Sequence, residues 1–186
     1  MKKLAALLMI FLMLTGCSET RDMLDKAMTF RADLLACESC TFDASVTADY
    51  GDEIYSFGMH CTGDNDGNLE FTVTSPETIA GITGEISGGE GALTFDDQAV
   101  AFPLLAEGQV TPVSGPWILL RTLMGGYLTA CSKEEDLIHL MVRDSYEADA
   151  LDLEIWLDDN MHPVQTEIGY EGRRILTMEI ENFQIQ

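Results

Sequence analysis

Basic residues are scarce in this chain. Only 10 of its 186 residues are Lys or Arg, against 32 Asp or Glu, which leaves a formal net charge of −22. Nucleic-acid binding needs a basic face and adhesion to anionic lipid headgroups needs basic clusters, so the composition argues against both. Solubility and self-repulsion are the simplest interpretation of the acidic excess, and a basic partner or bound cations are the sharper alternative.

A long hydrophobic run is also missing. The most apolar segment, residues 4–14, would rise only about 16 Å as a helix, roughly half of the hydrocarbon core of a bilayer. It follows Lys2 and Lys3 and leads into Leu14-Thr15-Gly16-Cys17. A basic start, an apolar core and small residues before a cysteine are typical of a bacterial lipobox, where a signal peptidase cuts before a diacylglycerol-modified cysteine. The alternative is an ordinary secretory signal with an incidental cysteine.

The N-terminal pattern sets the expected domain organisation and location. We predict a lipoprotein signal peptide over residues 1–16 and one domain over residues 17–186, anchored outside the cytoplasm through lipid on Cys17. Removing Lys2 and Lys3 changes the net charge from −22 to −24, because residues 1–16 contain no acid. Such a domain is not held on an anionic membrane by charge, so two or three acyl chains must hold it there.

Catalytic signatures are absent from the sequence. His60, His139 and His162 fall on different predicted strands or turns, and no nucleophile motif such as GxSxG lies near them. A solvated acidic surface explains the many carboxylates more simply than a general acid–base pair does. We therefore predict a protein that is not an enzyme and uses no cofactor.

Metal-binding motifs are incomplete. The turn Asn65–Asn68 resembles part of a calcium loop, but Thr62 and Val73 stand where the first ligand and the closing Glu should be. The single CxxC motif, Cys37 to Cys40, lacks a second CxxC or a His pair to complete a tetrahedral site. No metal site is predicted.

Four cysteines remain beside Cys17, namely Cys37, Cys40, Cys61 and Cys131. An even count outside the cytoplasm favours structural disulfides, with free thiols and redox or metal roles as the alternatives. A redox CxxC opens a helix within a βαβ unit, whereas this motif is expected to close a helix and open a strand.

Hydrophobic periodicity predicts two helices and nine or ten strands. Residues 18–36 carry apolar side chains at helical spacing, and a nearly all-apolar second helix is expected from Pro116 to Ala130. Most other segments alternate with a period of two, and the long connection Pro103–Pro116 is expected to be functional or mobile. The prediction is a mostly β, α+β fold in which two apolar helices cover a large antiparallel sheet.

The register of the first hairpin brings two cysteines together. If Gly51-Asp52 forms a two-residue loop, Phe42 faces Cys61, and Cys40 lies diagonal to Cys61 on the same face. A Cys40–Cys61 bridge is therefore the first candidate, and it leaves the other two cysteines for each other. The sequence alone leaves this connectivity open.

Two passages carry a resemblance to a known family. Leu69–Glu77 reads as a strand followed by a Pro-containing turn, and Ile155–Gly172 reads as two strands around an Asp turn. With the lipobox, the N-terminal helix and the final meander, the chain resembles the LolA/LolB-like superfamily of lipoprotein carriers and receptors, which includes RseB. The resemblance implies a strongly curved antiparallel sheet, an incomplete β-barrel, whose concave apolar face is covered by helices and holds acyl chains.

Under this carrier hypothesis, inward-facing residues line an apolar-ligand groove, with the Pro103–Pro116 connection and the second helix as a lid. A filled core is the alternative for the same residues. An open apolar channel would favour a carrier, and a packed interior would favour a docking scaffold. The candidate groove residues are Phe42, Val46, Tyr55, Phe57, Phe71, Val73, Trp117, Leu120, Leu123, Met124, Leu140, Leu153 and Ile155.

The anchor and the four additional cysteines also make the chain similar to the GerS-like lipoproteins of spore-forming Gram-positive bacteria, which bind a cell-wall amidase. That branch implies a non-catalytic docking scaffold for a cell-envelope or germination enzyme. The expected partners are thus the membrane, through the lipid anchor, and a lipid, a lipoprotein or an envelope protein.

Overall fold

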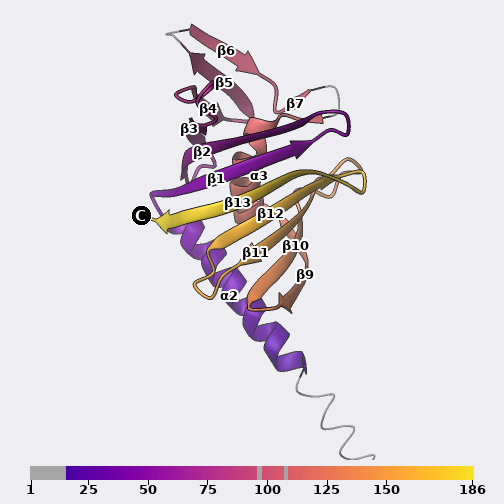
Figure 1. Cartoon of the computed structure of the whole chain (residues 1–186). Coiled ribbons are helices and arrows are strands. Elements are labelled where there is room, and N and C mark those ends of the chain that lie inside the picture. The colour runs from indigo at the N-terminus through magenta and orange to yellow at the C-terminus, as the bar shows by residue number, and fades with distance from the viewer. Residues whose placement is uncertain (1–15, 96–97, 107–108) are drawn as a thin grey trace, which may run out of the picture.

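The structure, a computed structural model, describes residues 16–95, 98–106 and 109–186 (Figure 1). Residues 1–15 and the side chain of Cys17 lie outside the described residues, so the predicted signal peptide and lipidation site fall there as well. Helix α2, Gly16–Ala36, confirms the first predicted helix. In the described part of the chain, no helix is both long enough and apolar enough to cross a bilayer.

Within the described residues, eleven strands form one antiparallel sheet in the order β6-β5-β4-β3-β2-β1-β13-β12-β11-β10-β9. The sheet is open, with β6 and β9 at its two edges. The strands are β1 Ser39–Asp49, β2 Ile54–Asp64, β3 Leu69–Ser75, β4 Thr83–Ser87, β5 Glu90–Phe95, β6 Gln98–Phe102, β9 Tyr127–Glu134, β10 Leu137–Arg143, β11 Asp152–Leu157, β12 Pro163–Tyr170 and β13 Arg173–Ile185.

The first and last strands of the chain, β1 and β13, pair at the centre of the sheet. From this pair the chain runs by hairpins toward β6 on one side and β9 on the other. The predicted register of the first hairpin is confirmed, because Phe42 pairs with Cys61 and the Tyr50 N–H donates to the Glu53 carbonyl at 3.1 Å. Strict alternation of buried and exposed residues along β1 fixes this register, since a one-residue slip would turn its apolar face to solvent.

One connection carries the chain from the β6 edge across to the β9 edge. It holds a small second sheet, β7 Leu105–Ala106 and β8 Gln109–Val110, then the 3-10 turn η1 Pro112–Ser114, and then helix α3, Gly115–Gly125. Ser114 precedes α3, but its hydroxyl donates to the Thr111 carbonyl at 2.6 Å and does not cap the helix.

Helix α3 is shorter than the sequence predicts, because it ends at Gly125 and not at Ala130. Glycine has low helix propensity, and Gly126 adopts an extended conformation with ψ of 162°. A Cβ on Gly126 would lie 2.7 Å from Val142, so only glycine allows the chain to turn this closely into β9. Tyr127 therefore begins a strand that the sequence did not indicate.

Both helices lie on the same face of the curved sheet (Figure 1). One side of α2 is buried through Met23, Ala27, Phe30 and Leu34, at the three- and four-residue spacing of an amphipathic helix. Helix α3 is buried on nearly every side. These features confirm the predicted fold class: mostly β with two helices, one open antiparallel sheet and a core between sheet and helices.

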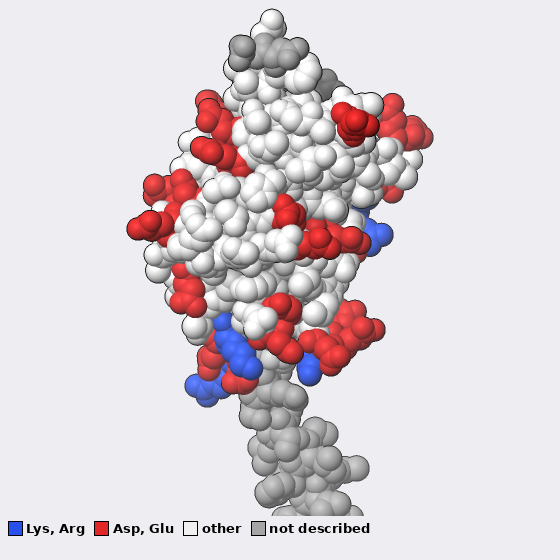
Figure 2. Space-filling view, turned by 60° about the vertical axis from the view of Figure 1, so that its left-hand side comes forward, with Lys and Arg blue, Asp and Glu red and all other residues white. Residues whose placement is uncertain are grey.

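Acidic side chains are spread over several parts of the surface, as Figure 2 shows for one face, whereas basic side chains are few there. The distribution is that of a charged, solvated surface.

Candidate functional site

Most of the predicted groove residues fill the core instead of lining an open space. Ten of the thirteen are no more than 8% exposed. Phe57 and Trp117 are half-buried, and Tyr55 is 46% exposed. The ten buried residues, all in one cluster, are Phe42, Val46, Phe71, Val73, Leu120, Leu123, Met124, Leu140, Leu153 and Ile155.

The interior between the helices and the β9–β10 side of the sheet is tightly packed. A gap of only about 10 Å³ lies there, lined by Phe30, Leu123 and Leu140 among others. That volume is at the limit for a single water molecule. The region where the sequence placed the acyl-chain site is thus a filled core in this structure.

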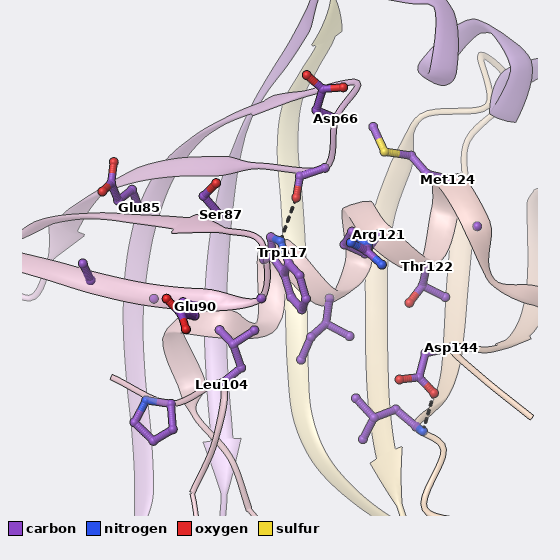
Figure 3. A pocket seen from close by; sticks show the side chains of 18 of the residues that line it. Asp66, Glu85, Ser87, Glu90, Leu104, Trp117, Arg121, Thr122, Met124 and Asp144 are labelled. Atoms are coloured by element: carbon purple, nitrogen blue, oxygen red, sulfur yellow. Dashed lines mark hydrogen bonds between the residues drawn. The ribbon is translucent and has the colours of Figure 1, made fainter. Parts of the chain in front are cut away.

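An open groove of about 1300 Å³ lies on the other side of α3 (Figure 3). Its lining comes from α3, from the β2–β3 turn and from the hairpins β4–β5–β6, with Leu35 of α2 and the β10–β11 loop at its border. We call this space the α3 groove. Of the predicted groove residues, only Trp117 and Met124 line it.

Trp117 is held in a fixed orientation in the α3 groove. Its Nε1–H donates to the Gly67 carbonyl at 2.8 Å, and the Arg121 guanidinium lies 5.3 Å above its ring (Figure 3). A half-buried tryptophan with its polar edge satisfied presents a large, rigid apolar surface to whatever enters the groove.

The β2–β3 turn that anchors Trp117 is organised by Asp64. Its carboxylate accepts hydrogen bonds from the Asn68 N–H at 2.9 Å, the Asn68 Nδ2 at 2.8 Å and the Asp66 N–H at 3.0 Å. Burial tends to raise the pKa of Asp64, but these hydrogen bonds outweigh it and hold the pKa below its usual range. The turn is therefore ordered chiefly by one ionised side chain.

Small residues and one aromatic ring form the sheet wall of the α3 groove. A Cβ on Gly91 would lie 2.3 Å from the Phe102 ring, so Phe102 packs directly over the backbone of its pairing partner. Ala92, Ala101 and Leu104 continue this wall. A mostly apolar wall facing Trp117 can accommodate a hydrocarbon chain or another apolar group.

Polar side chains also line the α3 groove. Four carboxylates line it, from Asp66, Glu85, Glu90 and Asp144, but only one basic side chain, Arg121. Thr122, also in the lining, is 2% exposed, and its Oγ1 has no hydrogen-bond partner in the described part of the protein. These polar residues lie in turns, on β4 and β5, and on α3, where no sequence pattern marked them as part of a site.

The predicted disulfides are not formed in this structure, in which Cys37, Cys40, Cys61 and Cys131 are free thiols. Cys40 pairs with Gly63 and Cys61 pairs with Phe42, so the two cysteines are diagonal neighbours, as expected. Residues in diagonal positions lie about 7–8 Å apart, which is farther than a disulfide bond allows between the residues it joins. Cys131 lies on the edge strand β9, with four strands between it and β1.

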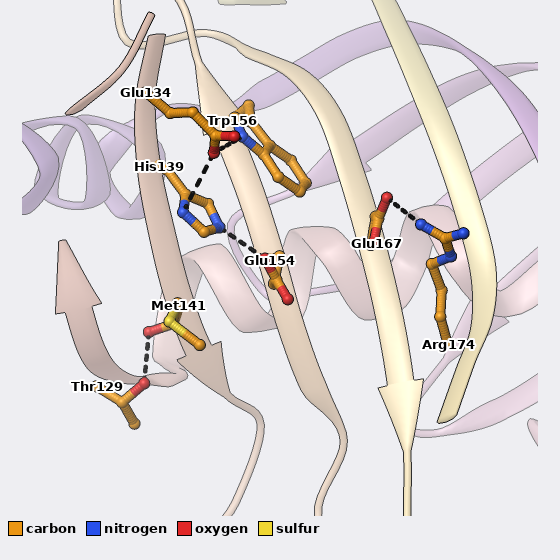
Figure 4. A network of polar contacts seen from close by, with 8 residues as sticks. All are labelled: Thr129, Glu134, His139, Met141, Glu154, Trp156, Glu167 and Arg174. Atoms are coloured by element: carbon orange, nitrogen blue, oxygen red, sulfur yellow. Dashed lines mark hydrogen bonds and ion pairs between the residues drawn. The ribbon is translucent and has the colours of Figure 1, made fainter. Parts of the chain in front are cut away.

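The histidines do not converge on a common site. His139 stacks on Trp156 with ring centroids 4.6 Å apart, and its Nε2 lies 2.9 Å from Glu154, across β10 and β11 (Figure 4). His60 Nδ1 lies 2.7 Å from Asp43 on the neighbouring strand. These are cross-strand pairs of a sheet. In the described residues, no three or more His, Cys, Asp or Glu side chains form a group that could hold a metal ion.

No protein-family model matches the sequence, and comparison with curated proteins finds no match either. The fold is similar to several solved structures. One is an outer-membrane lipoprotein-sorting protein domain from Vibrio parahaemolyticus, with a TM-score of 0.49 and 8% identity over 90% of this chain and 93% of that chain. Another is a LolA superfamily protein from Nitrosomonas europaea, with a TM-score of 0.45 and 11% identity over 90% of this chain and 93% of that chain.

A third similar structure is the lipoprotein LppX from Mycobacterium tuberculosis, with a TM-score of 0.38 and 13% identity over 89% of this chain and 93% of that chain. In each case the similarity extends over most of both chains.

Proposed function

We propose that this chain is a lipid-anchored, extracytoplasmic binding protein that holds an apolar ligand, a lipid or the acyl chains of a lipoprotein, in the α3 groove. The groove itself carries the proposal. It measures about 1300 Å³ in a domain whose interior is otherwise closely packed. Ligand pockets of roughly 300–1,000 Å³ hold small molecules, so the space is ample for a hydrocarbon chain.

The proposed site differs from the one that the sequence suggested. A ligand would lie between Trp117 and the Phe102–Leu104 wall and would displace solvent, without separating the packed core. Uptake would then require no unfolding of the interior, where closely packed side chains resist rearrangement.

The proposed anchor and the groove lie toward opposite ends of α2. Cys17 is at the start of this helix, and Leu35, one residue before its end, lines the α3 groove. The eighteen residue steps from Cys17 to Leu35 rise about 27 Å along the helix, so a lipid on Cys17 would hold the groove at a fixed distance from the membrane.

Native mass spectrometry of the full chain, produced in bacteria with its own leader and purified in a mild detergent, tests the ligand. We expect an adduct of lipid mass. Leu35→Glu should abolish the adduct, whereas Leu24→Glu should retain it. The two leucines lie on the same helix and are 49% and 38% exposed, but only Leu35 lines the groove. A wild-type protein without any adduct, even after lipid is added, would contradict the proposal.

The anchor has a separate test in the intact mass of the same preparation. We expect a chain that begins at Cys17 and carries diacylglycerol. Cys17→Ser should leave the leader attached and the lipid absent. Cleavage without lipid in the wild type would instead indicate an ordinary secreted protein.

A docking scaffold remains the second candidate, and the edge strand β6 favours it. Its sequence, Gln98–Phe102, carries no charge, Val100 is 63% exposed, and no described strand pairs with its outer side. An uncharged edge strand can accept a strand from a partner. Val100→Lys should then abolish partner capture while leaving the lipid adduct intact.

A further inference from the structure

One end of the α3 groove contains polar groups that have no hydrogen-bond or ion-pair partner among the described residues. Among the described residues, no carboxylate lies within ion-pair distance of Arg121, although four carboxylates line the same groove. The Thr122 hydroxyl next to it is buried and unpaired. A buried hydroxyl without a partner costs free energy, which a bound ligand could recover.

Arg121 is exposed, and the aliphatic part of its side chain packs against the β2–β3 turn. Its Cδ would lie 2.8 Å from a Cβ on Gly67, which has a φ of +80°, so Gly67 allows the arginine to lie directly on the β2–β3 turn. Asp66 precedes that glycine. In Figure 3, Arg121 and Thr122 extend from α3 with Asp66 on one side and Asp144 on the other.

Asp144 is also held in place. One of its carboxylate oxygens accepts the Leu151 N–H at 2.7 Å, which fixes the start of the β10–β11 loop. An unpaired cation and a buried hydroxyl thus lie between carboxylates from two different loops. We call Asp66, Arg121, Thr122 and Asp144 the polar end of the α3 groove.

The charges at the polar end discriminate between kinds of ligand. A purely anionic head would meet Arg121 but be repelled by the carboxylates, and a purely cationic head would leave Arg121 and Thr122 unpaired. A head that carries both charges satisfies both sets of groups through charge-assisted hydrogen bonds.

We infer that the polar end binds the headgroup of a zwitterionic aminophospholipid, with the phosphate on Arg121 and Thr122 and the ammonium on Asp66, one of the two flanking carboxylates. The inference rests on the proposed function, which places the acyl chain of the same molecule beside Trp117. Arginine suits the phosphate because its planar guanidinium can donate two parallel hydrogen bonds.

The test compares three single-chain probes with the same lauroyl chain, each below its micelle concentration, by calorimetric titration of the full chain carrying Cys17→Ser. The probes are lysophosphatidylethanolamine, lysophosphatidylglycerol, which keeps the phosphate but lacks the ammonium, and monolaurin, which has neither. We expect the first to bind about tenfold more tightly than the second, because charged hydrogen bonds typically contribute that much.

Two variants separate the two charges of the head. Arg121→Gln should reduce the affinity for both phospholipids to that for monolaurin, and Arg121→Lys should restore part of it. Asp66→Asn should narrow the difference between the two phospholipids and leave monolaurin unchanged. Arg21→Gln, an exposed change on α2 away from the groove, should alter none of the three affinities.

The outcomes distinguish this inference from the proposed function. Equal binding of all three probes would overturn the headgroup inference but retain the apolar site. No binding of any probe would overturn both. Tightest binding of lysophosphatidylglycerol would show an anion site and also contradict the inference.

Discussion

The two halves of the concave face are built from the same sheet but differ in what covers them. On the face of β1, β13 and β12 that the helices α2 and α3 cover, residues such as Val46, Ile168 and Leu176 are at most 1% exposed. Beside β4–β6, the same face opens into the α3 groove. We call these regions the filled half and the open half.

Side-chain volume explains part of the difference. On β5 and β6 the groove lining includes Gly91, Ala92 and Ala101. Side chains of this size leave space between these strands and α3 that larger side chains would fill. The open half therefore depends on small residues as much as on the curvature of the sheet.

The position of α3 explains the rest. A Cβ on Gly115 would lie 3.0 Å from the Met178 sulfur, and a Cβ on Gly63 would lie 2.2 Å from Leu120. These two glycines allow the helix to lie very close to the centre of the sheet. A helix drawn toward the centre leaves the β4–β6 side uncovered, so tight packing in one half produces the open space in the other.

The largest effect is expected from Phe42→Ala in the filled half. Phe42 is 1% exposed and stacks on Phe183 with ring centroids 5.6 Å apart. Its removal should lower the free energy of unfolding by about 3–5 kcal/mol, measured by urea denaturation. Val100 in the open half is 63% exposed. Val100→Ala should therefore change the free energy of unfolding by less than about 0.5 kcal/mol. Similar losses at both positions would remove the distinction between the halves.

Thiol reactivity measures how closely the filled half is packed. Cys40 is fully buried, and burial, assisted by the nearby Cys37, raises its pKa to about 12. Near pH 8 its thiolate fraction should be roughly two-thousandfold below that of an ordinary thiol with a pKa of ~8.5. Maleimide labelling of the native, reduced protein, mapped by mass spectrometry, should modify the half-exposed Cys131 first.

The same labelling tests the predicted disulfides. If the extracytoplasmic protein forms a Cys40–Cys61 bridge, neither cysteine should label after unfolding unless a reductant is added. Labelling of native Cys40 as fast as Cys131 would show that the filled half is open to solvent.

Ala101→Trp should fill the open half from the sheet side. Ala101 is exposed and lines the α3 groove, so a larger side chain there has space without disturbing the core. We expect affinity for an apolar probe such as monolaurin to fall about tenfold, equivalent to ~1.4 kcal/mol, with little change in stability. A matched Ala99→Trp, on the same strand but outside the groove lining, should leave the affinity unchanged.

The sequence predicted the fold better than the site. Period-two alternation along residues 41–50 and the two-residue turn after them determine the register of the first hairpin, because both are local. The predicted end of helix α3 was wrong, because a tertiary contact at Gly126 determines where the helix stops. Pairing of β1 with β13 depends on residues more than a hundred positions apart, which periodicity does not detect.

The groove illustrates a second limit of sequence analysis. Large apolar residues such as Leu153 and Ile155 look the same in sequence whether they line a cavity or fill a core. The residues that keep the α3 groove open are small ones, such as Gly91, and turn residues, such as Gly67, whose effect depends on what lies opposite. Trp117 was found because a large aromatic on an apolar helix is conspicuous.

The smallest effect is expected at Asp64, which supports the open half through the β2–β3 turn. Because the folded protein lowers its pKa, the stabilisation that the ionised carboxylate provides is fully present above the unfolded pKa of ~3.9 and is lost as the pH falls through the folded value. Asp64→Asn should therefore lower the free energy of unfolding by about 1 kcal/mol at pH 7, and the difference from wild type should shrink below pH 4.

Urea denaturation of both proteins at pH 7 and pH 3 measures this difference. Asp66→Asn is the matched control, because Asp66 lies in the same turn and is exposed. Since the turn presents the Gly67 carbonyl to Trp117, Asp64→Asn should also weaken binding of an apolar probe slightly. A loss of stability without any loss of binding would show that the groove does not depend on this turn, and that α3 alone positions Trp117.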